Sequence, residues 1–170
     1  MLQDSLSGIR FHFYRRYLDM KKNYIDLPEA YKFVTPGVPV LIGTKGKNPG
    51  QYNLAPIAWN CPLDYEPVTK VLFVSDPAHQ TALNAKREGR FAFCIPLSDS
   101  VPEIEKCGSV SDPEADKFKL FDIKSIPCEK IDALVPLCSK AVIECELIGT
   151  YREENAEIFM GRALAAYSLE

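Results

Sequence analysis

The run from Gly50 to Pro96 reads GQYNLAPIAWNCPLDYEPVTKVLFVSDPAHQTALNAKREGRFAFCIP, and it holds the pattern that decides the fold. Short apolar segments, rich in β-branched and aromatic residues, alternate with residues that favour turns. This pattern is typical of β-strands rather than of long helices. Strands are therefore expected from Gln51 to about Asn60, from Val71 to Ser75 and from Phe91 to Ile95.

One short helix is expected between the last two of these strands. The residues from Thr81 to Glu88 suit two helical turns. Thr81 belongs to the residue types that cap the start of a helix, and Gly89 is the type that most often ends one. The sequence thus predicts a strand, a helix and a strand in succession.

The chain on either side of this run also favours strands. Strands are expected over residues 38–44, 141–151 and 158–167, with a hairpin loop over 45–50 and a polar turn over 152–155. Residues 97–140 are punctuated by proline and hold short helical candidates at Val101 to Lys106 and Glu114 to Leu120. Strands that follow one another without regular helical crossovers predict an antiparallel sheet closed into a barrel, so the expected fold is mainly β with a few short helices.

Composition limits the class of protein. The 170 residues, 46% hydrophobic and 25% charged, suit one folded domain with a sizeable core. A formal net charge of -3 argues against nucleic acid as a partner, because backbone binding needs a basic surface. No run approaches the ~20 apolar residues of a membrane helix, and the start lacks the apolar core of a signal peptide. The expected location is the cytoplasm, with no membrane contact.

The first 24 residues differ from the remainder because basic and aromatic residues are mixed there. They are interpreted as an N-terminal extension that packs on the domain, or as sequence upstream of a start at Met20, with a surface-binding helix as the alternative. Residues 25–170 are expected to form the domain. No chemistry is assigned to the extension.

The six cysteines give no sign of a metal site. They are spread singly, without the C-x-x-C spacing of a zinc, iron–sulfur or dithiol centre. Several lie within apolar runs, which favours reduced, partly buried thiols. No metal ligand is predicted, and the two histidines, His12 and His79, are too far apart in sequence to suggest a catalytic triad.

A group of hydrogen-bond donors suggests a site for a phosphate. Ser75, Thr81 and Asn84 offer hydroxyl and amide donors, and Thr81 stands where a helix would direct free N–H groups at an anion. Lys117 could add a positive charge. Taken singly, Thr81 could only cap its helix, Ser75 only end its strand and Lys117 only be solvated. Trp59, the one tryptophan, could belong to the core or to a cofactor site.

In combination these segments resemble the flavin reductase-like family of FMN-binding split barrels, and most closely its flavoredoxin and archaeal ferric reductase branch. The resemblance runs from about Val38 to Ala165. The matching pieces are Tyr52-Asn53-Leu54-Ala55-Pro56-Ile57-Ala58-Trp59, Asp76 with Thr81 and Asn84, Gly89-Arg90-Phe91, Asp116-Lys117-Phe118, Ala141-Val142-Ile143-Glu144-Cys145, and Ile158-Phe159 with Gly161. The fold implied is a split β-barrel, antiparallel and Greek-key-like.

The resemblance also implies a site. Asn53, Leu54, Ala55 and Pro56 would line the isoalloxazine edge of FMN, with Trp59 nearby. Ser75, Thr81 and Lys117 would hold the ribityl phosphate, and Asn84 and Phe118 complete the predicted cofactor-binding set. No side chain is assigned a catalytic role. Family members often carry Gly-Asp-His before the last strand, whereas this chain has Glu154-Asn155-Ala156 and no imidazole there.

The activity implied is electron transfer through FMN. NADH or NADPH is the expected donor, a small molecule such as free flavin or a ferric complex is the expected acceptor, and a homodimer is the expected assembly. Two alternatives remain open. One is an FMN electron carrier reduced by a redox partner protein, and the other is a split barrel that has lost flavin and acts as a binding module.

Overall fold

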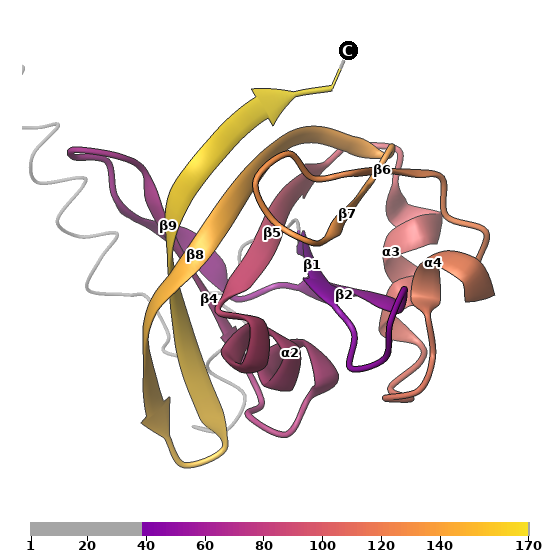
Figure 1. The fold of residues 1–170 in the computed structure, drawn as a ribbon, viewed down its shortest axis with the longest axis horizontal. Helices are drawn as coiled ribbons and strands as arrows, with labels where there is room; N and C mark the ends of the chain where they lie inside the picture. The colour runs from indigo at the N-terminus through magenta and orange to yellow at the C-terminus, as the bar shows by residue number, and fades with distance from the viewer. Residues whose placement is uncertain (1–38, 170) are drawn as a thin grey trace, which may run out of the picture. The chain divides into compact units, whose positions relative to one another are not determined.

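The computed structural model describes residues 39–169, and Figure 1 shows how their strands and helices are arranged. The predicted extension over residues 1–24, its boundary with the domain and His12 lie outside the described residues. The strands are β1 (Val40–Lys45), β2 (Tyr52–Ile57), β3 (Asn60–Asp64), β4 (Lys70–Ser75), β5 (Arg90–Pro96), β6 (Ser125–Pro127), β7 (Leu134–Pro136), β8 (Ser139–Glu153) and β9 (Ala156–Ser168). The helices are α2 (Gln80–Glu88), α3 (Val101–Gly108) and α4 (Lys117–Leu120).

Seven of the strands form one antiparallel sheet in the order β2-β1-β5-β8-β9-β4-β3. The two strands at its ends, β2 and β3, are separated in the chain only by Ala58 and Trp59. The two edges of the sheet must therefore come together, and the sheet curls into a barrel. This confirms the mainly β, split-barrel fold predicted from the sequence.

The prediction of a single strand from Gln51 to Asn60 is wrong. The chain turns at Ala58 and Trp59, so β2 ends at Ile57 and β3 begins at Asn60. The amide of Asn60 donates to the carbonyl oxygens of Ile57 and Ala58, at 3.0 and 3.2 Å, which stabilises the turn. Beyond it, the carbonyl of Trp59 accepts from the N–H of Val74 on β4 at 2.9 Å. The turn lets one continuous segment supply both edges of the sheet.

The expected helix forms, but Thr81 is not its N-cap. Helix α2 begins at Gln80 and its N-cap residue is His79. The Thr81 hydroxyl accepts a hydrogen bond from the side chain of Asn53 on β2, at 2.9 Å, so a tertiary contact takes the place of the local cap. The predicted end is correct, since Gly89 has a left-handed φ of 61° and its N–H bonds the carbonyl of Ala85.

The proline-rich region contains more strand and less helix than expected. A two-stranded sheet of β6 and β7 was not predicted, since each strand is only three residues long. Helix α3 matches the expectation to within two residues. Helix α4 is shorter than expected because Asp116 caps it, with its carboxylate accepting from the N–H of Lys119 at 3.2 Å.

Side chains on both faces of the central strands are buried. On β1, Val40 and Ile42 belong to the core cluster that also contains Ala82 and Ala85 of α2. Their neighbour Leu41 points the other way, into a second cluster completed by α3, α4, β6 and β7. Alternation along a strand thus gives each face of the sheet its own apolar layer. No helix within residues 39–169 is long and apolar enough to cross a membrane.

Three aromatic rings from different strands form the centre of the first cluster. Phe73 of β4 stacks on Phe159 of β9, with ring centroids 4.8 Å apart, and meets Phe91 of β5 edge-on at 5.1 Å. Gly161 leaves room for this group, since a Cβ at that position would overlap the Phe91 ring. The rings join strands that are far apart in the sequence.

We expect Phe73→Ala to lower the free energy of unfolding by about 3–5 kcal/mol, since it opens a cavity among these rings. Equilibrium urea unfolding of the ligand-free protein measures the change. Tyr65→Ala is the control, because Tyr65 is 78% exposed and its loss should change stability by less than about 0.5 kcal/mol. Equal stabilities of the two variants would contradict this account of the core.

Candidate functional site

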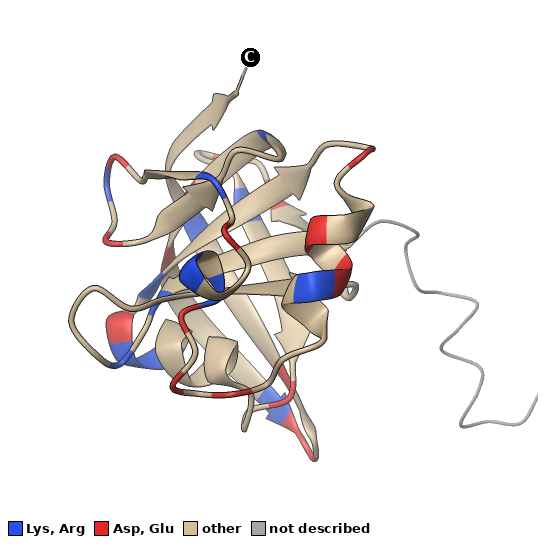
Figure 2. Cartoon of the chain, turned by 90° about the vertical axis from the view of Figure 1, so that its right-hand side faces the viewer, with Lys and Arg blue, Asp and Glu red and all other residues tan. Residues whose placement is uncertain are grey.

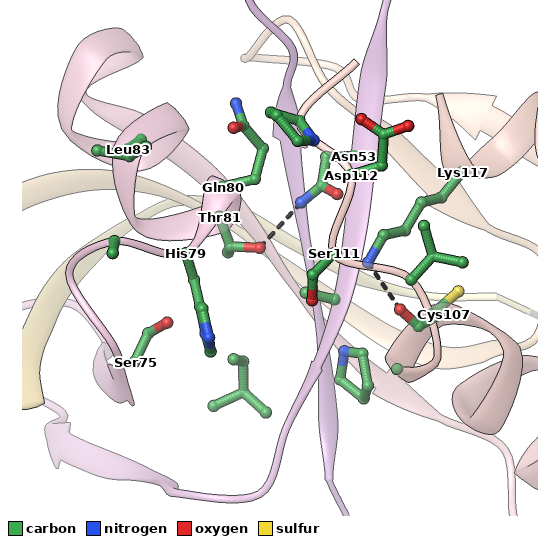
Figure 3. A pocket seen from close by; sticks show the side chains of 17 residues that line it. Asn53, Ser75, His79, Gln80, Thr81, Leu83, Cys107, Ser111, Asp112 and Lys117 are labelled. Carbon is green, nitrogen blue, oxygen red and sulfur yellow. Dashed lines mark hydrogen bonds between the residues drawn. The ribbon is translucent and has the colours of Figure 1, made fainter. Parts of the chain in front are cut away.

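A cavity of about 280 Å³ opens between β2, the start of α2 and the segment that links α3 to α4 (Figure 3). Three segments that are distant from one another in the sequence line it. They are Asn53, Ala55, Pro56 and Ile57; Ser75, Ala78, His79, Gln80, Thr81 and Leu83; and Cys107, Gly108, Val110, Ser111, Asp112, Pro113 and Lys117.

A second cavity, of about 340 Å³, adjoins the first. The two share Pro56, Ile57, Ser75 and His79 as walls. The second adds Ala58, Trp59, Val74, Asp76, Asn155 and Ala156, and so reaches the turn between β8 and β9. Together they form one cleft, which is more polar at the Lys117 end than at the Trp59 end.

Most of the residues predicted for the site line this cleft. Asn53, Ala55, Pro56, Ser75, Thr81 and Lys117 line the first cavity, and Trp59 lines the second. Trp59 is 43% exposed, so it is not the core residue that its type alone would suggest.

Three predicted residues have side chains elsewhere. Leu54 is buried in the second core cluster because neighbours on a strand face opposite ways, and Phe118 lies in the same cluster. Asn84 is buried, and its amide is occupied: it donates to the Thr44 hydroxyl at 3.1 Å and accepts from Gln80 at 2.7 Å. Their roles in binding stay predictions, and Asn84 acts in the structure as a link between α2 and β1.

The start of α2 faces the first cavity with groups suited to an anion. The first N–H groups of any helix lack partners within it, and they carry its positive dipole end. Here the His79 side chain makes no capping hydrogen bond, and no acidic residue lies in the first turn. Thr81 adds a hydroxyl held in place by Asn53.

Lys117 stands on the opposite wall of the cavity, at the start of α4 (Figure 3). Only 6% of the residue is exposed, and its ammonium donates to the carbonyl oxygen of Cys107 at 2.7 Å. Among residues 39–169 it forms no ion pair, and burial lowers its pKa. A buried ammonium whose hydrogen-bond partner is a neutral carbonyl favours an anionic ligand, because the anion would supply a countercharge.

The segment that carries Lys117 is tied to the β1–β2 hairpin. The Gln51 amide donates to the carbonyl of Pro113 at 2.9 Å, and the Tyr52 N–H donates to the Asp116 carboxylate at 3.3 Å. Lys119 reaches back to the carbonyl of Gly50 at 2.9 Å. These contacts hold both walls of the cavity at a fixed separation.

Some cleft residues were missed by reasoning from sequence. His79, Gln80 and the segment from Cys107 to Pro113 showed no motif of their own, and only the closed fold brings them to the cleft. Cys107 is no nucleophile at neutral pH, because burial raises the pKa of its thiol to about 11. No group of three or more metal-ligating side chains occurs in the described part of the chain.

Comparison with known proteins establishes the family. Residues 34–170 match the model of the flavin reductase like domain, so the chain belongs to this family, as its motifs predicted. It is 27% identical over 145 residues to the uncharacterized protein YddH of Escherichia coli (strain K12), covering 84% of this chain and 76% of that one.

Solved structures share the fold. Flavoredoxin from Methanosarcina acetivorans has a TM-score of 0.72 at 25% identity, with 89% of this chain and 77% of that chain covered. The FMN-binding protein from Thermus thermophilus has a TM-score of 0.73 at 21% identity, covering 88% and 79%. The NADH:FAD oxidoreductase SgcE6 of Streptomyces globisporus C-1027 has a TM-score of 0.75 at 16% identity, covering 88% of each chain.

We expect the free energy of unfolding of the wild-type protein to rise at alkaline pH, and Lys117→Met to abolish the part of this rise that Lys117 causes. Because burial lowers the pKa of Lys117 in the folded state, the unfolded chain binds more protons between that lowered pKa and the ordinary value of about 10.4. The free energy of unfolding therefore increases with pH across this window. Urea unfolding of the ligand-free protein at a series of alkaline pH values measures it.

Lys119→Met is the matched control, since this side chain is 75% exposed on the same helix. Apart from these two lysines, the groups that titrate at alkaline pH are common to all three proteins, and each variant lacks one lysine, so the difference between the variants reports on the burial of Lys117. Identical pH profiles for wild type and Lys117→Met would show that its ammonium is hydrated rather than buried.

Proposed function

We propose that this chain is an FMN-dependent oxidoreductase that passes electrons from NADH or NADPH through the flavin to a small acceptor, such as free flavin or a ferric complex, and that it works as a homodimer. The observation that supports this most is the buried ammonium of Lys117. It faces a cavity that also receives the Thr81 hydroxyl and the start of α2. An anionic ligand would satisfy all three.

The phosphate of FMN fits this end of the cleft. It carries about -1.5 to -2 charges near neutral pH and accepts several hydrogen bonds, as do other phosphate monoesters. Thr81 and the first N–H groups of α2 would donate to it, and Lys117 would supply the charge. Ser75, which is buried beside them, would complete the set.

The isoalloxazine ring suits the other end. Backbone and side-chain atoms of Asn53, Ala55 and Pro56 form one wall that leads from the first cavity toward Trp59. The second cavity is mostly apolar and has room for a planar ring beside the indole. A ligand with an anionic end and an apolar, planar end matches both cavities in order.

Flavin, when bound, supplies the electron transfer itself, and the protein binds, orients and shields it. None of the residues assigned to the flavin site is needed as a general acid or base for this role. We therefore assign this chain binding residues and no catalytic side chain for the transfer.

An FMN electron carrier is the second candidate function. The similarity to a flavoredoxin at 25% identity favours it. In that case a protein partner would reduce the flavin, and the net charge of -3 would suit a basic docking surface on that partner.

The test is a visible absorption spectrum of the purified protein with added FMN, followed anaerobically by NADH and then by NADPH. Bleaching of bound flavin by either nucleotide is the result expected for the oxidoreductase. Bound flavin that only dithionite reduces would support the electron carrier. A protein that takes up no FMN would overturn both and leave a flavin-free binding module, for which Ala156 in place of histidine is the available hint.

We expect Thr81→Ala and Lys117→Ala each to weaken FMN binding by about 1 to 3 kcal/mol, because each removes a hydrogen bond or a charge from the phosphate. Flavin retained after dialysis and fluorescence titration measure the effect. Thr81→Ser should restore binding, since it keeps the hydroxyl, and Lys124→Ala should leave it unchanged, because Lys124 is exposed and lines neither cavity. If a Thr81→Ala, Lys117→Ala double variant retained all of its FMN after dialysis, the phosphate would not bind where we place it.

A further inference from the structure

The opening of the cleft beside Trp59 has an acidic surround. Asp76 is the one acidic residue among the described residues that line the second cavity, and none of them is a lysine or an arginine. The β8–β9 turn beside this cavity carries Glu153 and Glu154 and the cation Arg152, which donates to the carbonyl of Glu154 at 3.2 Å. Among these residues carboxylates therefore outnumber cations.

The charge of the chain as a whole does not set this balance. Figure 2 shows acidic and basic segments interspersed over the visible face, so the field at one opening depends on the few residues around it. The first cavity differs from the second, since the buried ammonium of Lys117 lies on its wall. The two ends of the cleft thus suit groups of different charge, an anionic one at the Lys117 end and an uncharged one at the Trp59 end.

The walls at the Trp59 end suit a flat ring that carries hydrogen-bond acceptors. Trp59 is 43% exposed, and an indole face stacks well against another planar ring. Ala156 lines the same cavity with only a methyl group, which leaves space beside it. Ser75 and Asn155 bring a hydroxyl and an amide, and both groups can donate hydrogen bonds to carbonyl oxygens.

We propose that the small acceptor is an uncharged quinone that enters at Trp59, and that Asp76 is a specificity-determining residue that disfavours anionic acceptors of the same shape. This rests on the proposed function, because it assumes that reduced FMN occupies the cleft. It narrows the acceptor to one chemical class, since flavin phosphates and ferric complexes of carboxylate ligands carry negative charge and an uncharged quinone does not.

The transfer balances without a further reactant. A quinone that takes two electrons and two protons from reduced flavin becomes a hydroquinone, and the flavin returns to its oxidised form. Under the proposed function, NADH or NADPH restores the reduced flavin. The residues of this chain have only to admit the ring, orient its carbonyl oxygens and disfavour anions.

Asp76 can lose its charge without losing the turn that it supports. One of its carboxylate oxygens accepts a hydrogen bond from the N–H of Ala78 at 2.8 Å, and its backbone carbonyl accepts from the N–H of His79 at 3.0 Å. Asparagine keeps a side-chain oxygen for the first bond and leaves the second unchanged. Asp76→Asn therefore isolates the effect of the charge.

The first experiment follows reoxidation of the FMN-loaded protein. The protein is reduced anaerobically with one equivalent of dithionite and mixed with naphthoquinone or with naphthoquinone sulfonate, which adds one negative charge. Two unit charges about 4 to 7 Å apart in water interact strongly enough to change a rate about three- to five-fold. We expect Asp76→Asn to react with the sulfonate faster by that factor, and with naphthoquinone at the wild-type rate.

The second experiment measures binding without turnover. Trp59 is the only tryptophan of the chain, so quenching of its fluorescence reports on this end of the cleft. Titration of the FMN-free protein gives the Kd of each quinone. We expect the Kd of naphthoquinone sulfonate to be about three- to five-fold lower in Asp76→Asn than in wild type, and the Kd of naphthoquinone to be the same in both.

Asp122→Asn is the matched control. It removes one carboxylate from a side chain that is 86% exposed and lines neither cavity, so it should change no rate and no Kd. His79 is present in every protein compared, so its charge contributes equally to all. A further variant, Ala156→Leu, fills the space beside Trp59 and should slow reoxidation by both quinones.

Equal effects of Asp76→Asn and Asp122→Asn would show that only overall charge matters and would overturn the inference. An unchanged reaction of Asp76→Asn with the sulfonate would overturn it as well, as would wild-type rates with both quinones in Ala156→Leu. In each of these cases, flavin bleached by NADH or NADPH would leave the proposed function standing. Failure of wild type to bind FMN would overturn the proposed function, and this inference with it.

Discussion

Closure of the antiparallel sheet at Ala58 and Trp59 is the constraint on which the rest of the structure depends. One continuous segment leaves the sheet at β2 and re-enters it at the opposite edge as β3, so the edges must meet. This connection curls the sheet around the aromatic group at Phe73. Residues of the turn at Trp59, of the turn before α2 and of the β8–β9 turn then line one cavity. The cleft lies at the seam, where β2 and β3 are joined by the turn and not by a strand ladder.

Hydrogen bonds fix the walls of the cleft, and one wall carries the buried ammonium of Lys117. Asn53 ties β2 to Thr81 of α2, and hydrogen bonds from Gln51 and Tyr52 fix the segment that carries Lys117. Burying the Lys117 ammonium beside a neutral carbonyl costs free energy that the ligand-free protein does not recover. Under the proposed function, an anionic ligand would recover this cost on binding. A variant made more stable by removing the buried ammonium would then bind that ligand more weakly.

Ala156 and His79 line one cavity from two different elements. Ala156, at the start of β9, has no functional group, whereas His79 enters the same cavity from the turn before α2. The two positions are far apart in sequence and lie on different elements.

The sequence by itself determined the class of fold and named seven of the residues that line the cleft. Alternating apolar residues and turn residues predicted the strands, Gly89 marked the end of α2, and the combined motifs around Asn53, Thr81 and Lys117 indicated the family, because these signals act over a few residues. Tertiary structure decided the remainder. The turn at Ala58 and Trp59 depends on where the sheet closes, the Thr81 hydroxyl is drawn to Asn53 rather than to its own helix, and the pleat sends Leu54 into the core. His79 gained its place only when two distant segments came together, since no local pattern records which residues a closed barrel will make neighbours.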